Sequence, residues 1–317
     1  MNALITGITG FAGSHLAAHL LAEGDRLLGI SRRGVWSDDV PREITRQVPL
    51  LAWDLAEPIA PPQAVLEAIS RFAPEAIYHL AALSIPAQCG GGEPTAAAWA
   101  TNVEGTGRVI DLALGLKRPP RLLQVSSNKV YAPVANESPK VTERSPLGPQ
   151  NGYGKTKLAA EQRMRQAAKQ GLDGVIARSF QHAGPRQDRR LMLSEWARQF
   201  ATPTNDPVVI RTRQAVLDLS DVRDVVRAYR RLVLRGQGGM IYNVGSGIGR
   251  QSGAIFDLLR RLADPGRATL EEHGRRIQEP IADVNRLEQA TAWRAEIPLE
   301  RTLADTLAYW RERLAKG

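Results

Sequence analysis

A tyrosine and a lysine four residues apart are the first side chains in this sequence that could perform acid–base chemistry. The segment NGYGKTKLAAE contains Tyr153 and Lys157, which share one face if the segment is helical. A neighbouring ammonium favours the phenolate and lowers the pKa of a tyrosine from its ordinary value of about 10. Such a tyrosine exchanges a proton with an alcohol or a carbonyl near neutral pH. We therefore interpret Tyr153 and Lys157 as a candidate acid–base pair.

A hydroxyl group at the end of a predicted strand is the third candidate. The segment QVSSNKVY places Ser126 and Ser127 after the apolar run RLLQV. This strand and the tyrosine helix are separated by a polar, proline-rich loop that reaches about residue 152. The order strand, loop, helix could bring a serine and Tyr153 to one edge of a sheet.

Three glycines at a spacing of three predict a phosphate-binding loop near the N-terminus. In LITGITGFAGSHL, Gly7, Gly10 and Gly13 lie between a predicted strand and a helix that begins near Phe11. Glycine allows a positive φ, a close approach of the backbone to a pyrophosphate and tight packing of helix on strand. The first N–H groups of the helix then face the phosphates. In this βαβ setting the loop indicates a dinucleotide site.

The residues after the second predicted strand indicate which dinucleotide is bound. An NAD site usually has an acid there that holds the ribose 2′-hydroxyl, but this chain reads Ser31, Arg32 and Arg33. Two guanidinium groups suit a 2′-phosphate and can stack on adenine. NADP(H) is therefore favoured over NAD(H). Asp54 and Leu55, after the third predicted strand, are placed to meet the adenine edge.

Strand-like and helix-like segments alternate through the first half of the chain, which predicts a parallel sheet covered on both faces. The expected class is α/β: a Rossmann doubly wound sheet with a smaller C-terminal substrate-binding α/β domain. We place the Rossmann domain at residues 1–178, with 216–246 returning to it, and the substrate domain at 179–215 and 247–317. Predicted strands are 2–6, 26–31, 48–55, 75–82, 121–127 and 173–180, and predicted helices include 94–116, 153–170, 191–201 and 303–314.

Composition narrows the classes of partner and compartment. The 317 residues carry a net charge of +9, but the arginines are scattered and no nucleic-acid recognition motif appears, so we expect no nucleic-acid partner. No apolar run is long enough for a membrane span, and no signal-peptide layout appears. A single cysteine, Cys89, fits a reducing compartment, so a cytoplasmic location is expected. No metal site is expected.

The motifs together resemble an extended short-chain dehydrogenase/reductase of the NAD-dependent epimerase/dehydratase family that acts on nucleotide-linked sugars. The resemblance runs through HLAA, TNVEGT, SSNKVY, YGKTK, QHAGPRQ, LDLSDVRDV, YNVGSG and IPLERTL. It implies that Ser127 binds the reacting oxygen, that Tyr153 is the acid/base, and that Lys157 lowers the pKa of the tyrosine and holds the nicotinamide ribose. It also implies a homodimer through the helices near 95–115 and 153–170. Further implied cofactor residues are Leu80, Ala81 and Ala82, which line the channel, and Asn102, which lies behind the cofactor strand.

The two residues that directly follow Ser127 bear on which reaction the protein could catalyse. Dehydratases of this family carry an acidic pair there, whereas this chain has Asn128 and Lys129, so 4,6-dehydration is disfavoured. A 4-ketoreductase and a 4-epimerase both remain possible. An epimerase keeps NAD bound and prefers an acid after the second strand, and since this chain lacks that acid, the reductase is favoured. The resemblance extends to GDP-4-keto-6-deoxy-D-mannose reductases, which form GDP-D-rhamnose. It implies hydride transfer from NADPH to C4 and protonation by Tyr153. A non-catalytic cofactor-binding protein is the remaining alternative.

The substrate side departs from the family pattern. Leu217 stands where the family has an arginine on the diphosphate, and Gln181 replaces an asparagine. Other arginines must then supply the charge that a nucleotide-sugar requires. The expected substrate-binding residues are Gln181, Arg186, Arg213 and Arg275.

Overall fold

Seven parallel strands form the central sheet of the computed structural model, which describes residues 1–135, 139–274 and 276–316. Their order across the sheet is β11-β7-β5-β4-β1-β2-β3. The strands are largely buried, as parallel strands covered on both faces must be. Their bounds are β1 (Asn2–Thr6), β2 (Arg26–Ser31), β3 (Leu50–Ala52), β4 (Ala76–His79), β5 (Arg121–Ser127), β7 (Gly174–Ser179) and β11 (Ile241–Val244).

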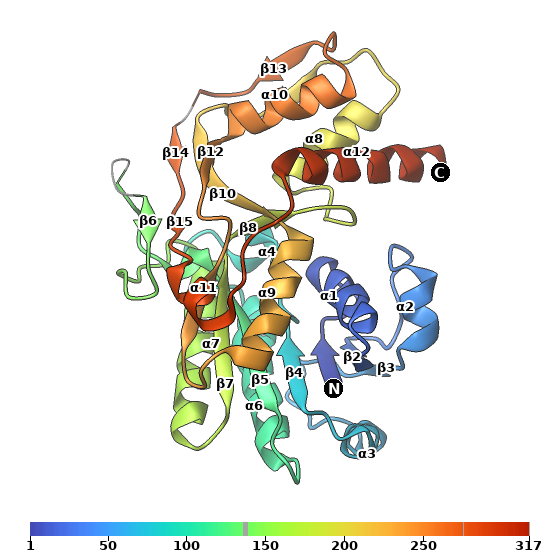
Figure 1. The fold of residues 1–317 in the computed structure, drawn as a ribbon, viewed down its shortest axis with the longest axis vertical. Helices are drawn as coiled ribbons and strands as arrows, with labels where there is room; N and C mark the ends of the chain where they lie inside the picture. Colours follow the sequence, from blue (N-terminus) through green and yellow to red (C-terminus); the bar gives the residue numbers. More distant parts are fainter. Residues whose placement is uncertain (136–138, 275, 317) are drawn as a thin grey trace.

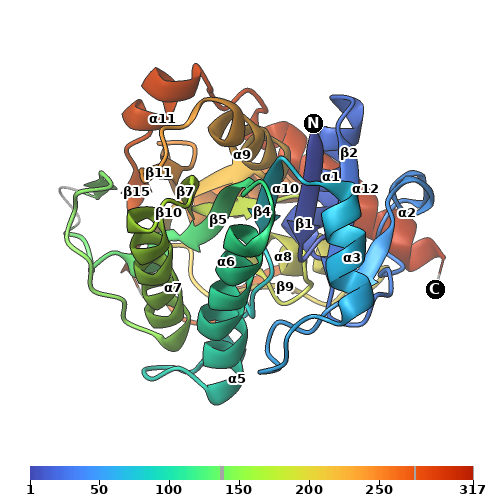
Figure 2. The same ribbon diagram turned by 90° about the horizontal axis from the view of Figure 1, so that it is seen from below.

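Helices cover both faces of this sheet (Figures 1 and 2). On one face, α1 (Phe11–Ala22), α2 (Arg42–Gln47), α9 (Val222–Arg235) and α11 (Asn285–Thr291) contribute to one apolar core. On the other, α3 (Gln63–Phe72), α6 (Gly105–Gly115) and α7 (Gly152–Lys169) enclose a second core. The expected Rossmann-type α/β class is confirmed.

One predicted helix is interrupted by a wider turn. The periodicity over 94–116 predicts a single helix, but the structure has α5 (Ala96–Trp99), the π-helical segment η1 (Ala100–Glu104) and then α6. The extra residue of a π turn shifts the helical register, and such turns are frequent at functional sites. Here the π segment carries Asn102, which is buried.

A smaller sheet lies above the carboxyl ends of the central strands (Figure 1). The strand β10 (Ala215–Asp221) pairs with β8 (Gln181–Ala183), β12 (Gly249–Gln251) and β14 (Ile277–Gln278). The return to the large sheet therefore begins with α9 at Val222, and residues 216–221 lie in the smaller sheet. The remaining elements are α4 (Pro86–Cys89), η2 (Asn128–Val130), β6 (Lys140–Val141), α8 (Met192–Ala201), β9 (Val208–Ile210), α10 (Ser252–Ala263), β13 (Thr269–Glu271), β15 (Ile281–Ala282) and α12 (Leu299–Ala315).

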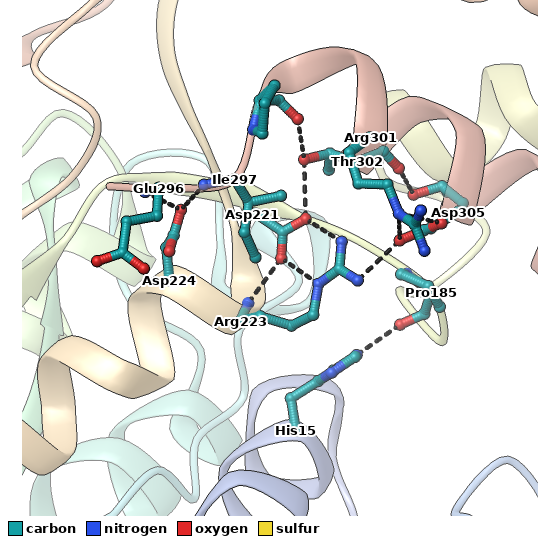
Figure 3. Close-up of polar contacts among 12 residues, drawn as sticks. His15, Pro185, Asp221, Arg223, Asp224, Glu296, Ile297, Arg301, Thr302 and Asp305 are labelled. Carbon is teal, nitrogen blue, oxygen red and sulfur yellow. Dashed lines mark hydrogen bonds and ion pairs between the residues drawn. The ribbon is translucent and has the colours of Figure 1, made fainter. Parts of the chain in front are cut away.

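A polar junction fixes the C-terminal helix to the Rossmann helix α9 (Figure 3). Asp221 caps α9 by accepting from the backbone N–H of Arg223 at 2.8 Å, and it also receives the Thr302 hydroxyl at 2.8 Å. The Arg223 guanidinium reaches on to Asp305 of α12 at 2.7 Å. The buried carboxylate of Asp221 thus has charged and neutral donors, which a buried acid requires.

Among the helices of the described residues, none is long and apolar enough to cross a membrane.

Candidate active site

A cleft of about 900 Å³ opens where the carboxyl ends of the central strands face the smaller sheet. Ligands in open α/β sheets bind at this edge. One side of the cleft is formed by the glycine-rich loop and the ends of β2, β3 and β4. The other side is formed by the ends of β5 and β7, the start of α7, and residues of β8, α8, β10 and β14.

The glycine-rich loop forms a cradle that larger residues would fill. Gly7 has φ = 73°, and a Cβ there would lie 2.7 Å from the backbone nitrogen of Ala81. A Cβ on Gly13 would lie 2.1 Å from the carbonyl oxygen of Gly7. The N-terminus of α1 has no side-chain cap, so its free N–H groups are directed toward the loop. This cradle fits the pyrophosphate of a dinucleotide.

The expected cofactor residues divide into those that line the cleft and those that do not. Both Arg32 and Arg33 are exposed, but only Arg32 lies in the cleft lining. Asn102 is also outside it. The expected cofactor residues in the lining are Gly7, Gly10, Phe11, Gly13, Arg32, Asp54, Leu55, Leu80, Ala81, Ala82 and Lys157.

Asn102 lies outside the cleft lining but holds the backbone of Leu83, which lines the cleft. Its side-chain oxygen accepts from the N–H of Leu83 at 2.8 Å, and its amide donates to the carbonyl of Leu83 at 3.0 Å and to Thr156 of α7 at 3.0 Å. Asn102 therefore holds the loop after β4 against the helix that carries Tyr153. The π turn of η1 is the local feature that presents it.

Ser127, Tyr153 and Lys157 come together in the cleft. Ser127 lies close enough to Tyr153 for its hydroxyl to stabilise the phenolate. The Lys157 ammonium lies 5.8 Å from the centroid of the Tyr153 ring and donates to the carbonyl of Val125 at 2.9 Å. The grouping contains a proton carrier, a hydroxyl that can bind an oxygen, and a cation, which are the components of acid–base chemistry at a carbonyl.

The protonation of this group differs from the sequence-based expectation. Burial raises the pKa of Tyr153 to about 12, and the nearby Ser127 hydroxyl opposes this rise only in part. Burial also lowers the pKa of Lys157 to about 8. The expectation of a lowered tyrosine pKa neglected desolvation, which disfavours both charged forms. At neutral pH Tyr153 therefore carries its proton.

The start of α7 explains how the tyrosine is aimed. Asn151 caps the helix by accepting from the N–H of Gly154 at 2.9 Å, as N-cap residues do. Gly152 packs against the end of α4, because a Cβ on Gly152 would lie 2.0 Å from the carbonyl oxygen of Cys89. The pair Asn151–Gly152 thus places Tyr153 in the first turn of α7.

The predicted substrate residues do not all face the cleft. Gln181 lines it, and its side-chain oxygen accepts from Asn128 at 3.3 Å. The arginines Arg186 and Arg213 lie outside the cleft lining. Arg186 donates to Ser14 of α1 at 3.2 Å, and Arg213 forms an ion pair with Asp257 of α10. Arg275 lies outside the described residues, and Leu217 is buried at the cleft wall.

Two ion pairs at the site were not predicted from the sequence. Lys129 pairs with Glu279 in the cleft lining, and Arg178 pairs with Glu161 behind it. The partners of the first pair are 150 residues apart, so no local motif could have joined them. For the second pair, the sequence did show one of the partners, since Glu161 lies four residues after Lys157 on the same helix face.

Comparison with known proteins agrees with this architecture. Residues 3–245 match the NAD dependent epimerase/dehydratase family. The chain is 29% identical to a GDP-6-deoxy-D-mannose reductase of Pseudomonas aeruginosa, over 98% of this chain and 97% of the relative.

Solved structures show the same fold. The chain is similar to a structure described as RMD from Pseudomonas aeruginosa complexed with NADPH, with a TM-score of 0.81, 26% identity and coverage of 98% and 99% of the two chains. A Thermotoga maritima UDP-glucose 4-epimerase with UDP-glucose shares the fold with a TM-score of 0.85 at 23% identity, over 99% and 100% of the chains. The protein therefore belongs to the NAD dependent epimerase/dehydratase family, among nucleotide-sugar reductases, epimerases and dehydratases of the extended short-chain type.

Proposed function

We propose that this protein is an NADPH-dependent reductase of a nucleotide-linked 4-keto-6-deoxy sugar of the GDP-4-keto-6-deoxymannose type. The observation that carries the proposal is the grouping of Ser127, Tyr153 and Lys157 in one cleft with the glycine cradle. The relative that reduces a GDP-linked sugar, similar over nearly the whole chain, supports the substrate class.

Tyr153 can act as the proton donor in a reduction. With a pKa of about 12, the phenol holds its proton at neutral pH and is ready to donate it. A ketone that is being reduced gains negative charge on its oxygen and needs a proton donor.

Each residue has a separate task in this mechanism. When bound, NADP(H) supplies the hydride. Tyr153 donates its proton to the carbonyl oxygen at C4, and the Ser127 hydroxyl donates a hydrogen bond that fixes this oxygen and stabilises its developing charge. The Lys157 ammonium lies close enough to stabilise the tyrosinate that forms. Gln181 is proposed to contact the sugar from the smaller sheet.

The end of β2 supports NADP(H) as the cofactor. Ser31, Arg32 and Arg33 stand where an NAD site has its acid, and Arg32 lines the cleft. A guanidinium there suits a 2′-phosphate. The similar structure that contains NADPH agrees with this choice.

The test is to mix the protein with NADPH and GDP-4-keto-6-deoxymannose and to follow the loss of NADPH absorbance. We expect turnover by the wild type and a loss of about 10²-fold or more in Tyr153→Phe. Tyr131→Phe is the matched control, because its hydroxyl bonds to Asn243 outside the cleft lining, at 2.6 Å. No turnover by the wild type, or equal turnover by Tyr153→Phe, would contradict the proposal.

A nucleotide-sugar 4-epimerase is the alternative, and its fold-level support is the similarity to the Thermotoga maritima enzyme. It would purify with tightly bound NAD(H) and would interconvert two sugars without net consumption of NADPH. Cofactor analysis of the purified protein separates the two functions.

We also propose a homodimer formed through α6 and α7. These helices lie side by side on one face of the sheet (Figure 2). Light scattering of the purified protein should give twice the mass of the chain, and a monomer mass would contradict this.

A further inference from the structure

The ion pair between Lys129 and Glu279 crosses the substrate side of the cleft. The Lys129 ammonium contacts both carboxylate oxygens of Glu279 at 2.6 Å. The side chains are 29% and 22% exposed, and both residues line the cleft. The pair therefore lies where a bound sugar would meet it.

The two partners come from different sheets on the substrate side of the cleft. Lys129 belongs to η2, immediately after β5, and its backbone N–H donates to the Ser127 hydroxyl at 3.2 Å. Glu279 lies between β14 and β15, and its backbone N–H donates to the carbonyl of Val216 in β10 at 2.9 Å. One partner is thus tied to the catalytic serine and the other to the smaller sheet.

The rest of the substrate wall among the described residues is electrically neutral. The other charged residues in the lining, Arg32, Asp54 and Lys157, are the ones expected to contact the cofactor. Burial lowers the pKa of His182, which keeps its imidazole neutral. Apolar residues in the same cleft lining include Phe180, Leu191, Met192, Leu193, Leu217 and Ile277.

We propose that Lys129 and Glu279 are a specificity-determining pair that selects an uncharged sugar and rejects a sugar carrying a carboxylate. Among the described residues, Lys129 is the cation on the substrate side of the lining that is not assigned to the cofactor, and Glu279 neutralises it. A second carboxylate beside Glu279 would meet like-charge repulsion in a partly desolvated site. A hydroxyl or methyl group on the sugar meets no such repulsion. The inference rests on the proposed function and narrows its substrate class to neutral sugars.

The test compares binding of matched ligands that differ in this charge. Protein loaded with NADP⁺ is titrated with GDP-mannose and GDP-mannuronic acid, and in parallel with UDP-glucose and UDP-glucuronic acid, by calorimetry. We expect the wild type to bind the neutral member at least about 10-fold more tightly. This ratio corresponds to about 1.4 kcal/mol.

The variants should shift this ratio in opposite directions. Glu279→Gln frees the Lys129 ammonium and should raise uronate affinity about 10-fold or more, with a change below about 3-fold for the neutral sugar. Lys129→Met leaves Glu279 without its partner and should weaken uronate binding further. A general disturbance of the fold would instead weaken both ligands in both variants.

The matched control is Glu93→Gln, which breaks the Lys155–Glu93 pair of 2.5 Å outside the cleft lining and should leave the ratio unchanged. Equal binding of both ligands by the wild type, or a parallel shift of the ratio in both variants, would overturn the proposed selection while leaving the reductase intact. Failure of all four nucleotide-sugars to bind would overturn the selection and the proposed substrate class together.

Discussion

Arg178 and Glu161 form a fully buried, bidentate ion pair between β7 and α7. The guanidinium donates to the two carboxylate oxygens at 2.9 and 2.7 Å, and both side chains are 0% exposed. Ser126 of β5 adds a third hydrogen bond to the carboxylate at 2.5 Å. The Arg178 guanidinium also lies over the Tyr131 ring, 4.9 Å from its centroid. The pair thus joins the catalytic helix to two strands of the sheet.

Removing one partner should be strongly destabilising. Glu161→Ala leaves the Arg178 charge buried without its counter-ion, and we expect a loss of about 3–5 kcal/mol in the free energy of unfolding. Urea denaturation followed by circular dichroism measures it. The double variant Glu161→Leu/Arg178→Met removes both charges and should recover much of the loss. Asp173→Asn, at the exposed Arg121–Asp173 pair, should cost less than about 1 kcal/mol. A loss of similar size in all three would contradict this reading.

Adjacent serines should have separable roles. Ser127→Ala removes the proposed donor to the reacting oxygen, and we expect kcat to fall about 10²–10³-fold with little change in stability. Ser126→Ala takes a donor from the buried Glu161 carboxylate and should cost about 1–3 kcal/mol of stability, with kcat within a few-fold. Paired kinetics and thermal melts check both. The reverse assignment of the two effects would refute the placement of Ser127 at the reacting oxygen.

Lys157 should limit stability at neutral pH. Its folded pKa of about 8 lies below the ordinary 10.5. Below pH 8 both states hold the proton, so folding bears the full desolvation penalty. From pH 8 to 10.5 the unfolded chain holds more protons, so the free energy of unfolding rises with pH. Lys157→Met should therefore raise the Tm at pH 7 by about 2–5 °C, and this gain should shrink toward pH 10.5.

The same titration predicts the pH profile of the enzyme. Loss of the Lys157 charge above pH 8 removes the cation that stabilises the tyrosinate, so wild-type kcat should fall there. Thermal melts of the cofactor-free protein measure the Tm change in Lys157→Met, and pH–rate profiles of the wild type measure the fall in kcat. A Tm gain independent of pH would show that desolvation of the charge is not its cause.

Arg32 and Arg33 should differ as cofactor contacts. Arg32 lines the cleft and Arg33 does not. A charge-assisted hydrogen bond contributes about 1.5–3 kcal/mol, so Arg32→Ala should raise the KM for NADPH roughly 10–100-fold and change that for NADH little. Arg33→Ala is the control and should alter either KM less than about 3-fold. Equal effects of the two substitutions would contradict this distinction.

The sequence alone determined the features that depend on local spacing. The period of the apolar residues predicted the α/β alternation, the glycines at 7, 10 and 13 predicted the cradle, and the i, i+4 relation joined Tyr153 to Lys157. Each of these lies within one turn, strand or helix, where chain geometry fixes which residues are neighbours.

Only the tertiary structure decided which distant residues meet. It paired Lys129 with Glu279 and Arg178 with Glu161, and it separated Arg32 from Arg33 at the cleft. It also placed Arg186 beside Ser14 and Arg213 beside Asp257, outside the cleft lining. It reversed the expected pKa shift of Tyr153 as well, since desolvation depends on everything packed around a group, and that surrounding shell is assembled from segments far apart in the chain.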